Sequence, residues 1–550
     1  MLEARALLDG QLPYIAVFDD KPLGAPVLIA VAMKVVGASL ITVRLLGCLA
    51  VVATALLLVQ LARLLRLPRA AGLAAAVLYI VFSAQFFGQW TSDELLLIPF
   101  TVAALCVAAA GWGATTWHRQ VATIVSMGVL FGVALWVKYV AAVPASAVFV
   151  ALVGSWMRRE RGLSKFLALG GLYAVACALP TALSALAYAS IGEFAAFWYC
   201  NFGFMHTYLG LVPTDKVVRH AIRGLHYIWP LLLCAAAGLY FGWRRRGEPP
   251  VPPPAMALLS VWVAAEALAV VAPWKFFDYY FLLLLPPLAL LSGVTLCVVA
   301  DRAVVPRYRA AAPWVLAGMI AVFPLHAVPG LVAGPDTPRR VAAVIRNDPH
   351  ATAWVVNYAP IIYFLADIPA PTRFPLPGHL VGGLSSLINT DPVAEVERIL
   401  AGRPRFLVVD ELALDHIRPQ TAAPIRAALT QRYTRVASFE SVGVFRYQTP
   451  LEMNRDADRT LRDADAKLNA AITAYRKRLI GSQLAAFDES QRRWDAFRKA
   501  TCEFAASGSA GSSAYPMSRA ACLTNYAADR LDIITGLMQC VEGDFSCPEF

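Results

Sequence analysis

Long apolar runs separated by short polar connections dominate the first 332 residues of the chain. A helix needs roughly 20 apolar residues to cross a bilayer, and ten of these runs approach that length. They lie near residues 40–62, 71–88, 94–112, 120–137, 141–157, 165–188, 227–243, 254–272, 279–299 and 312–332. The pattern predicts a polytopic α-helical membrane bundle of about ten helices over residues 40–332.

The composition changes to that of a soluble protein after residue 333. Strand-like runs at 352–358, 405–411 and 435–447 alternate with helical or loop stretches, which predicts a small α/β domain over 333–450. From residue 451 to residue 550 a charged, Ala-rich helical pattern predicts a separate α-helical module.

Basic residues give the orientation of the bundle. They cluster on alternate connections, at 63–69, 119, 158–165, 244–246 and 302–309, which the positive-inside rule makes cytoplasmic. Residues 1–39, the other connections and everything after 333 then face outward. Since nothing in the sequence carries residues 1–39 across the membrane, we expect either an eleventh span upstream of Met1 or a truncated, impaired protein.

The composition excludes an ordinary soluble protein, because 58% of the residues are hydrophobic, 15% are charged and the mean hydropathy is +0.58. The net charge of +11 comes from the short clusters between apolar runs. Nucleic-acid binding would need a basic face interleaved with aromatic residues on a soluble domain, so we expect no nucleic-acid partner.

Four cysteines, Cys502, Cys522, Cys540 and Cys547, lie together near the end of the chain, whereas the other six lie in or beside apolar runs. An even number of cysteines in a short polar segment predicts disulfides and an oxidising compartment. The cysteines and the basic clusters therefore agree on a periplasmic C-terminus.

The outward connections combine acidic residues with lysines. Asp20 and Lys21 lie in FDDKPLGAP, Asp93 in TSDELLL, Lys138 in LWVKYV, and Lys275 in APWKFFDYYF, which also contains Tyr280. Lysines beside an apolar bundle suit a phosphate whose lipid tail stays in the bilayer, and a carboxylate suits activation of an acceptor hydroxyl or amine. Alternatively, such residues are interfacial anchors at helix ends.

Several motifs resemble the GT-C membrane glycosyltransferases that use polyprenyl-phosphate sugars. The segment LEARALLDGQLPYIAVFDDKPLGAP is similar to the first outer loop of the glycosyltransferase family 39-like group, which contains protein O-mannosyltransferases and the aminoarabinose transferase. Asp93, Lys138 and the segment PWKFFDYYFLLLLPPLALL resemble later family motifs in the same order. The resemblance covers roughly residues 1–450.

This resemblance implies inverting transfer of a sugar from a polyprenyl-phosphate donor to an envelope acceptor, at the periplasmic face of a bacterial inner membrane. The catalytic aspartate usual in the family precedes the first-loop motif and lies outside this sequence, so Asp93 or Asp20 would serve as the base, or this short form would be impaired. The implied donor-phosphate residues are Lys21, Lys138, Lys275 and Tyr280. Asp20 and His206 are weak candidate ligands for a divalent metal.

Residues 453–530 resemble the lysozyme-inhibitor LprI type of module, through ADAKLNAAITAYRKRL and SQRRWDAFRKATCEF. The resemblance implies a seam formed by Leu468, Trp494 and Phe497, and the disulfides Cys502–Cys522 and Cys540–Cys547. Two interpretations remain for this module: binding of a lysozyme-like or other envelope protein, or a structural helical hairpin.

The main alternative function for the whole chain is an inactive transferase-like anchor that displays the C-terminal module. A transporter is disfavoured, because transporters place charged or unwound elements near the midplane of the membrane, whereas the charged residues here gather at one border.

Overall fold

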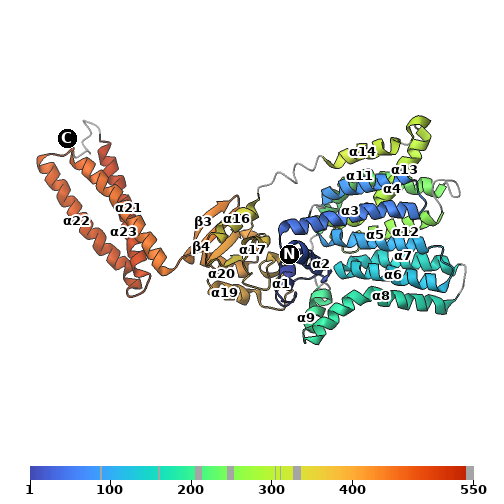
Figure 1. Ribbon diagram of the computed structural model, residues 1–550. Helices are drawn as coiled ribbons and strands as arrows, with labels where there is room; N and C mark the ends of the chain where they lie inside the picture. The colour runs from blue at the N-terminus through green and yellow to red at the C-terminus, as the bar shows by residue number, and fades with distance from the viewer. Residues whose placement is uncertain are drawn as a thin grey trace.

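The structure, a computed structural model, describes residues 1–86, 90–158, 162–204, 214–244, 253–303, 305–309, 311–325 and 336–540. Figure 1 shows a bundle of roughly parallel helices, a small domain built around a sheet, and a helical tail. The sheet domain lies between the other two parts, at the end of the bundle where the N-terminus also lies.

Nine helical segments in the described part of the chain are long and apolar enough to cross a membrane. The helices that contain them are α3 (Leu40–Leu64), α4 (Arg69–Ser83, extended by η1, Ala84–Phe86), α5 (Asp93–Gly111), α6 (Trp117–Val137), α7 (Ala142–Met157, preceded by η2, Tyr139–Ala141), α8 (Leu163–Ser190), α11 (Thr214–Arg244), α12 (Pro253–Val271) and α13 (Leu285–Ala303). The expected polytopic helical fold is therefore confirmed. The tenth expected span forms α14 (Ala312–Leu325), and the rest of its range lies outside the described residues.

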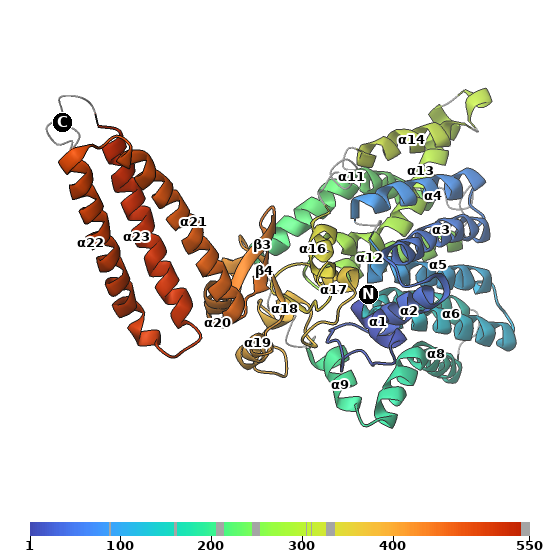
Figure 2. The ribbon, with the colours of Figure 1, turned by 60° about the vertical axis from the view of Figure 1, so that its left-hand side comes forward.

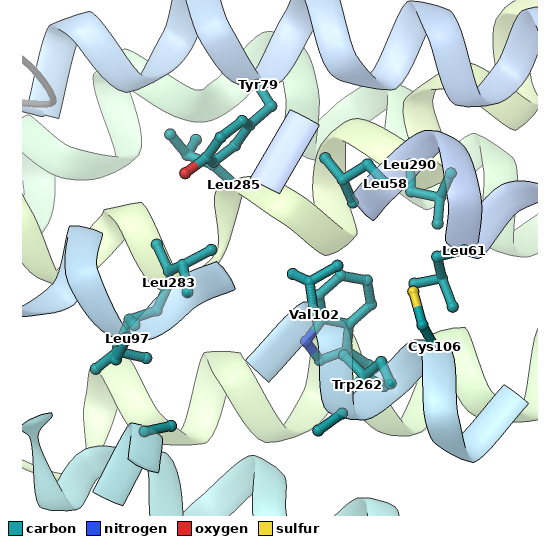
Figure 3. Close-up of a cluster of buried hydrophobic side chains, with 14 of the residues drawn as sticks. Leu58, Leu61, Tyr79, Leu97, Val102, Cys106, Trp262, Leu283, Leu285 and Leu290 are labelled. Carbon is teal, nitrogen blue, oxygen red and sulfur yellow. The ribbon is translucent and has the colours of Figure 1, made fainter. Parts of the chain in front are cut away.

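Large apolar side chains fill the centre of the bundle, and Figure 3 shows part of this core. Leu58 of α3, Val102 of α5 and Trp262 of α12 are almost completely buried. Small residues let neighbouring helices approach closely: a Cβ on Gly293 of α13 would lie 2.2 Å from the carbonyl oxygen of Ala71 in α4. Such close approach is typical of helix packing in membranes.

The first outer segment, expected as a loop over residues 1–39, contains two helices, α1 (Leu2–Leu8) and α2 (Gly24–Val36). Helix α2 has only 13 residues, too few to span a bilayer. It buries Ile29 and Met33 but leaves Val35 exposed, so apolar residues lie on both its buried and its exposed face. Its first residue, Gly24, lies against the backbone of Trp136 at the end of α6.

The sheet domain contains four strands in the order β1-β2-β4-β3, with β1 parallel to β2 and the other pairs antiparallel. The strands are β1 (Ala353–Val355), β2 (Phe406–Asp410), β3 (Tyr433–Phe439) and β4 (Val442–Tyr447). The expected α/β architecture is confirmed. The run 435–447, expected as one strand-like stretch, is a hairpin that turns at Glu440, whose φ is 56°.

Helices pack beside this sheet, and two sheet-domain segments contact the bundle. The helices are α16 (Thr337–Arg346), α17 (Ile361–Ala366), α18 (Pro377–Leu380), α19 (Pro392–Ala401) and α20 (Pro419–Arg432). The backbone amide of Phe18 donates to the carbonyl oxygen of Arg373 at 2.6 Å. The Tyr199 hydroxyl donates to the carbonyl oxygen of Leu387. These bonds fix the sheet domain against the outer loops of the bundle.

The tail consists of α21 (Pro450–Arg476), α22 (Gly481–Ala506) and α23 (Tyr515–Met538). Helix α21 starts three residues after β4 with a capping box, in which Thr449 and Glu452 satisfy each other's backbone amides. The Arg405 guanidinium lies 3.7 Å from the Glu452 carboxylate, so the junction is also tied to the sheet domain.

The structure confirms the Cys502–Cys522 disulfide, which joins α22 to α23. Leu468 is buried and Trp494 is partly buried in the tail core, as expected. The prediction for Phe497 is wrong: its side chain is 57% exposed and lies edge-on to Tyr526, because the helices turn it away from the seam. The predicted Cys540–Cys547 bridge lies partly outside the described residues.

Candidate functional site

The first outer loop presents Asp19, Asp20 and Lys21 at the end of the bundle that faces the sheet domain. Tyr14, with a φ of 68°, anchors this loop by donating its hydroxyl to the carbonyl oxygen of Lys21 at 2.6 Å. The Tyr188 hydroxyl of α8 donates to the carbonyl oxygen of Pro13 at 2.6 Å. The loop conformation is therefore fixed by buried tyrosines of the loop and of the bundle.

The start of α5 brings an acidic pair to the same place. Ser92 caps this helix by accepting a hydrogen bond from the amide of Leu95 at 3.3 Å, which sets Asp93 and Glu94 in the first turn. The Asp93 carboxylate lies 3.9 Å from the Lys21 ammonium. The structure thus brings together two of the residues that the sequence singled out.

Glu94 forms a direct ion pair with Lys138, the residue that directly follows α6. The Lys138 ammonium also lies over the rings of Tyr279 and Tyr280, 5.4 and 4.9 Å from their centroids. Both tyrosines belong to η4 (Asp278–Leu283). Lys138 and Tyr280 are therefore neighbours, as they would have to be to bind the same phosphate.

Lys275 precedes η4 in a strained connection, since Trp274 and Phe276 on either side have φ values of 52° and 48°. Its side chain is buried. Burial lowers the pKa of Lys275 to about 8, with the Asp20 charge acting to raise the pKa and the Lys138 charge acting to lower it. A lysine ammonium in this setting is poorly solvated and suited to an anionic partner.

Asp20 lies between the bundle and the sheet domain, where its carboxylate is 3.9 Å from Nε2 of His379 in α18. Burial, and then the negative charge of Asp19, raise the pKa of Asp20 to about 7. Burial lowers the pKa of His379. Asp20 therefore gains a proton far more readily near neutral pH than an ordinary aspartate does.

Burial also acts on the pKa values of Asp19 and Glu3, whose side chains interact with each other. Burial and the charge of Asp19 raise the pKa of Glu3 well above its usual range. For Asp19, burial acts upward, but the charge of Lys21 and the hydrogen bond from the Asp20 amide hold the pKa below its ordinary value. We infer that the carboxyl group of Asp19 is ionised and that of Glu3 is protonated.

Glu3, Glu94 and His379 are site neighbours that the sequence interpretation did not assign. Glu94 had a signal, because it follows Asp93 in the same helix start. Glu3 is a lone acid in the apolar stretch MLEARALL, and His379 lies 359 residues after Asp20 with no local pattern to mark it.

An apolar groove of about 430 Å³ runs along α8, and Leu135 near the end of α6 also lines it. Aromatic residues of α9 (Phe194–Trp198) and η3 (Tyr199–Gly203) form part of its wall. Tyr139, the residue after Lys138, also lines it, and its hydroxyl donates to Asn201 at 2.8 Å. The groove therefore passes close to the lysine that the two η4 tyrosines flank.

Among the described residues, no group of three or more His, Cys, Asp or Glu side chains is arranged to hold a metal ion. His206, a weak candidate ligand, lies outside the described residues.

Two segments of the chain match known protein families. Residues 20–183 match the family described as dolichyl-phosphate-mannose-protein mannosyltransferase, and residues 446–532 match the lysozyme inhibitor LprI family. These matches confirm both resemblances seen in the sequence. A search among curated proteins finds no match.

Solved structures of ArnT share the overall fold. ArnT from Cupriavidus metallidurans bound to undecaprenyl phosphate has 16% identity and a TM-score of 0.51, with 81% of this chain and 92% of ArnT covered. Its apo structure gives 17% identity and a TM-score of 0.51, with 81% and 91% covered. AglB from Archaeoglobus fulgidus, in complex with an inhibitory peptide and a dolichol-phosphate, gives 13% identity and a TM-score of 0.47, with 81% and 69% covered. The likeness to ArnT shows a GT-C type of fold.

Proposed function

We propose that this chain is a glycosyltransferase of the bacterial inner membrane that moves a sugar from a polyprenyl-phosphate donor to an envelope acceptor on the periplasmic face. The observation that carries the proposal is the gathering of Lys21, Lys138 and Lys275 near acidic side chains at one end of an apolar bundle. This arrangement suits a ligand with an anionic head and an apolar tail. The similar ArnT structure holds undecaprenyl phosphate.

The groove along α8 would take part of the polyprenyl tail, since its wall is almost entirely apolar. The phosphate would then lie near Lys138, with Lys275 on the same face of the bundle. Tyr280, which flanks Lys138, would offer a hydroxyl to a phosphate oxygen.

Transfer would be a single inverting displacement. An acceptor hydroxyl attacks the anomeric carbon, the bond from that carbon to the phosphate oxygen breaks, and the polyprenyl phosphate leaves with the bonding electrons. The acceptor proton passes to a carboxylate, for which we favour Asp20, because a pKa of about 7 suits a general base near neutral pH. Asp93 would then hold Lys21, although it stays the second candidate base.

The test is a sugar-transfer assay with purified protein in liposomes and a set of polyprenyl-phosphate sugars. We expect Lys21→Ala and Asp93→Ala to lower kcat/KM at least tenfold. The matched control is Lys34→Ala, which removes an exposed lysine of α2 and should leave activity unchanged. Full activity in both site variants would refute the proposed site.

We propose a second function for the tail, binding of a lysozyme-like or other envelope protein. The match of residues 446–532 to the LprI family supports it, as does the disulfide, which is typical of an oxidising compartment. A pull-down with hen or bacterial lysozyme tests the proposal, and failure of the full-length protein to retain any lysozyme would count against it.

A further inference from the structure

The helical tail contains a groove of about 450 Å³, which we call the tail groove. Residues between 465 and 472 of α21 form one wall, residues between 491 and 499 of α22 form the other, and Arg519 and Leu523 of α23 also line it. Figure 2 shows α23 between α21 and α22, and α23 packs against both. The disulfide from Cys502 to Cys522, the residue before Leu523, fastens α22 to α23 beside the groove.

Buried contacts hold the α22 wall in place. The Arg498 guanidinium is buried and donates to the carbonyl oxygen of Leu523, from Nε at 3.0 Å and from Nη2 at 2.7 Å. The guanidinium groups of Arg498 and Arg530 lie 5.3 and 5.5 Å from the centroid of the Trp494 ring, and cations at such distances attract an indole. The indole therefore has a fixed position at the groove before any ligand binds, which favours binding.

The charges of the wall favour a neutral ligand. Five charged side chains are among the described residues that line the groove, and each has an oppositely charged neighbour. The pairs are Arg498–Asp465 at 2.7 Å, Lys499–Asp495 at 2.6 Å and Arg519–Glu503 at 3.3 Å. A charged ligand would have to compete with these pairs for its partner, whereas a neutral ligand leaves them intact.

Side-chain amides on opposite walls offer hydrogen bonds. Asn469 of α21 lines the groove and is exposed. On α22, the side-chain oxygen of Gln491 accepts from Nε of Arg530 at 3.2 Å, but the amide nitrogen of Gln491 is buried without an acceptor among the described residues. An amide carries both donors and an acceptor, as a hydroxyl group does. A ligand hydroxyl at the α22 wall would supply the missing acceptor.

The remaining lining is apolar, and the groove is short. Leu468, Ile472, Leu523 and the Trp494 indole form its apolar part. The stretch 465–472 covers about 10 Å of α21, at about 1.5 Å per residue. A sugar ring combines hydroxyl groups around its rim with C–H groups on its faces and carries no charge. The three elements that line the groove are helices, so it has no sheet edge to which an extended peptide could add.

We propose that the tail groove binds a neutral saccharide of one or two rings. The Trp494 indole covers a C–H face of the sugar, and Asn469 and Gln491 bond to its hydroxyl groups. The inference goes beyond the functions proposed above, because neither gives the groove a ligand, and it does not depend on sugar transfer. Such a site would let the tail hold a glycan outside the membrane, on the same chain as the proposed transferase site.

The first experiment tests the class of ligand, with isothermal titration calorimetry of the full-length protein in lipid nanodiscs. The neutral sugar probes are chitobiose, cellobiose and mannobiose. Digalacturonate is the anionic probe, and a blocked Asn-Asn dipeptide is the neutral peptide probe. We expect at least one neutral disaccharide to bind at least tenfold more tightly than digalacturonate and the dipeptide. Binding of none of the three neutral disaccharides, or tighter binding of digalacturonate or the dipeptide, would overturn the proposal.

The second experiment tests the position of the site with the disaccharide that binds most tightly. Asn469→Trp fills the groove and should weaken binding at least tenfold, and Asn469→Ala, which removes the amide, should weaken it at least threefold. The matched controls are Asn525→Trp and Asn525→Ala, at an exposed position of α23 that does not line the groove, and both should keep the wild-type affinity. Circular dichroism checks that all four variants fold.

Wild-type affinity in both Asn469 variants would place the sugar elsewhere on the chain and overturn the proposal. Equal weakening by the Asn469 and Asn525 variants would also overturn it, because the effect would then not come from the groove. Neither measurement uses a sugar donor, so both results hold whether or not the chain transfers sugars.

Discussion

Replacing Lys138 by Met tests the ion pair at the end of α6. The Glu94 side chain is 2% exposed and that of Lys138 is 18% exposed, so removing the lysine charge leaves a buried carboxylate without its partner. Breaking a buried ion pair in this way typically costs about 3–5 kcal/mol. We expect Lys138→Met to lower the free energy of unfolding by that amount, as followed by tryptophan fluorescence during titration of mixed micelles with a denaturing detergent.

The double variant Glu94→Gln/Lys138→Met removes both charges together and should regain most of the stability, to within about 1–2 kcal/mol of wild type. Glu94→Gln alone should cost less than Lys138→Met alone, because Lys138 keeps its contacts with the η4 tyrosine rings. If the costs of the two single substitutions simply add in the double variant, the pair does not hold the site together as we argue.

The same double variant then isolates the proposed function of Lys138, because it folds but has no charge to offer a phosphate. Hydrogen bonds to charged groups contribute about 1.5–3 kcal/mol, which corresponds to a rise of roughly 10- to 150-fold in the donor KM. An unchanged donor KM in a stable double variant would show that Lys138 is structural only.

Three further predictions address pH, the disulfide and the junction. The transfer rate should rise as the pH passes about 7, where Asp20 loses its proton, and fall above about 8, where Lys275 loses its charge. Asp20→Asn should abolish the rise in rate with pH. A flat pH profile between pH 5.5 and 9 would contradict the roles proposed for Asp20 and Lys275. Replacing Cys502 and Cys522 by serine should destabilise the tail by about 3 kcal/mol, because the disulfide joins residues 20 positions apart in the sequence. An unchanged thermal transition of the tail, measured by circular dichroism of the full chain, would contradict this stabilising role of the disulfide. Thr449→Ala should cost about 1 kcal/mol by removing the capping box of α21, which should appear as faster proteolysis at the junction.

The spans were predictable because their cause is local: hydropathy over 20 or so residues decides whether a helix can enter a bilayer. The sequence also allowed the prediction that Lys21 and Asp93 lie on the same face of the membrane, because alternate connections between spans share one face. The sequence could not say how closely those residues approach, because the loop conformation depends on Tyr14 and Tyr188, and the latter lies in α8.

Glu94 and His379 illustrate what pattern reasoning misses. Asp93 and Glu94 look equivalent in the sequence, but successive residues of a helix point about 100° apart, so one acid interacts with Lys21 and the other with Lys138. His379 reaches Asp20 only through docking of the sheet domain on the outer loops, a contact with no periodic signature. Phe497 shows the opposite error, because an aromatic residue in a family-like motif need not face the core.

The capping box between β4 and α21 fixes how far the tail can reach. Helix α21 continues for 27 residues from a start that Arg405 ties to the sheet domain, and at about 1.5 Å per residue it is about 40 Å long. A tail joined through a flexible linker could point in many directions from its attachment point. The short, capped junction instead limits the directions in which the tail can point, and the tail lies on the side of the sheet domain away from the bundle (Figure 1).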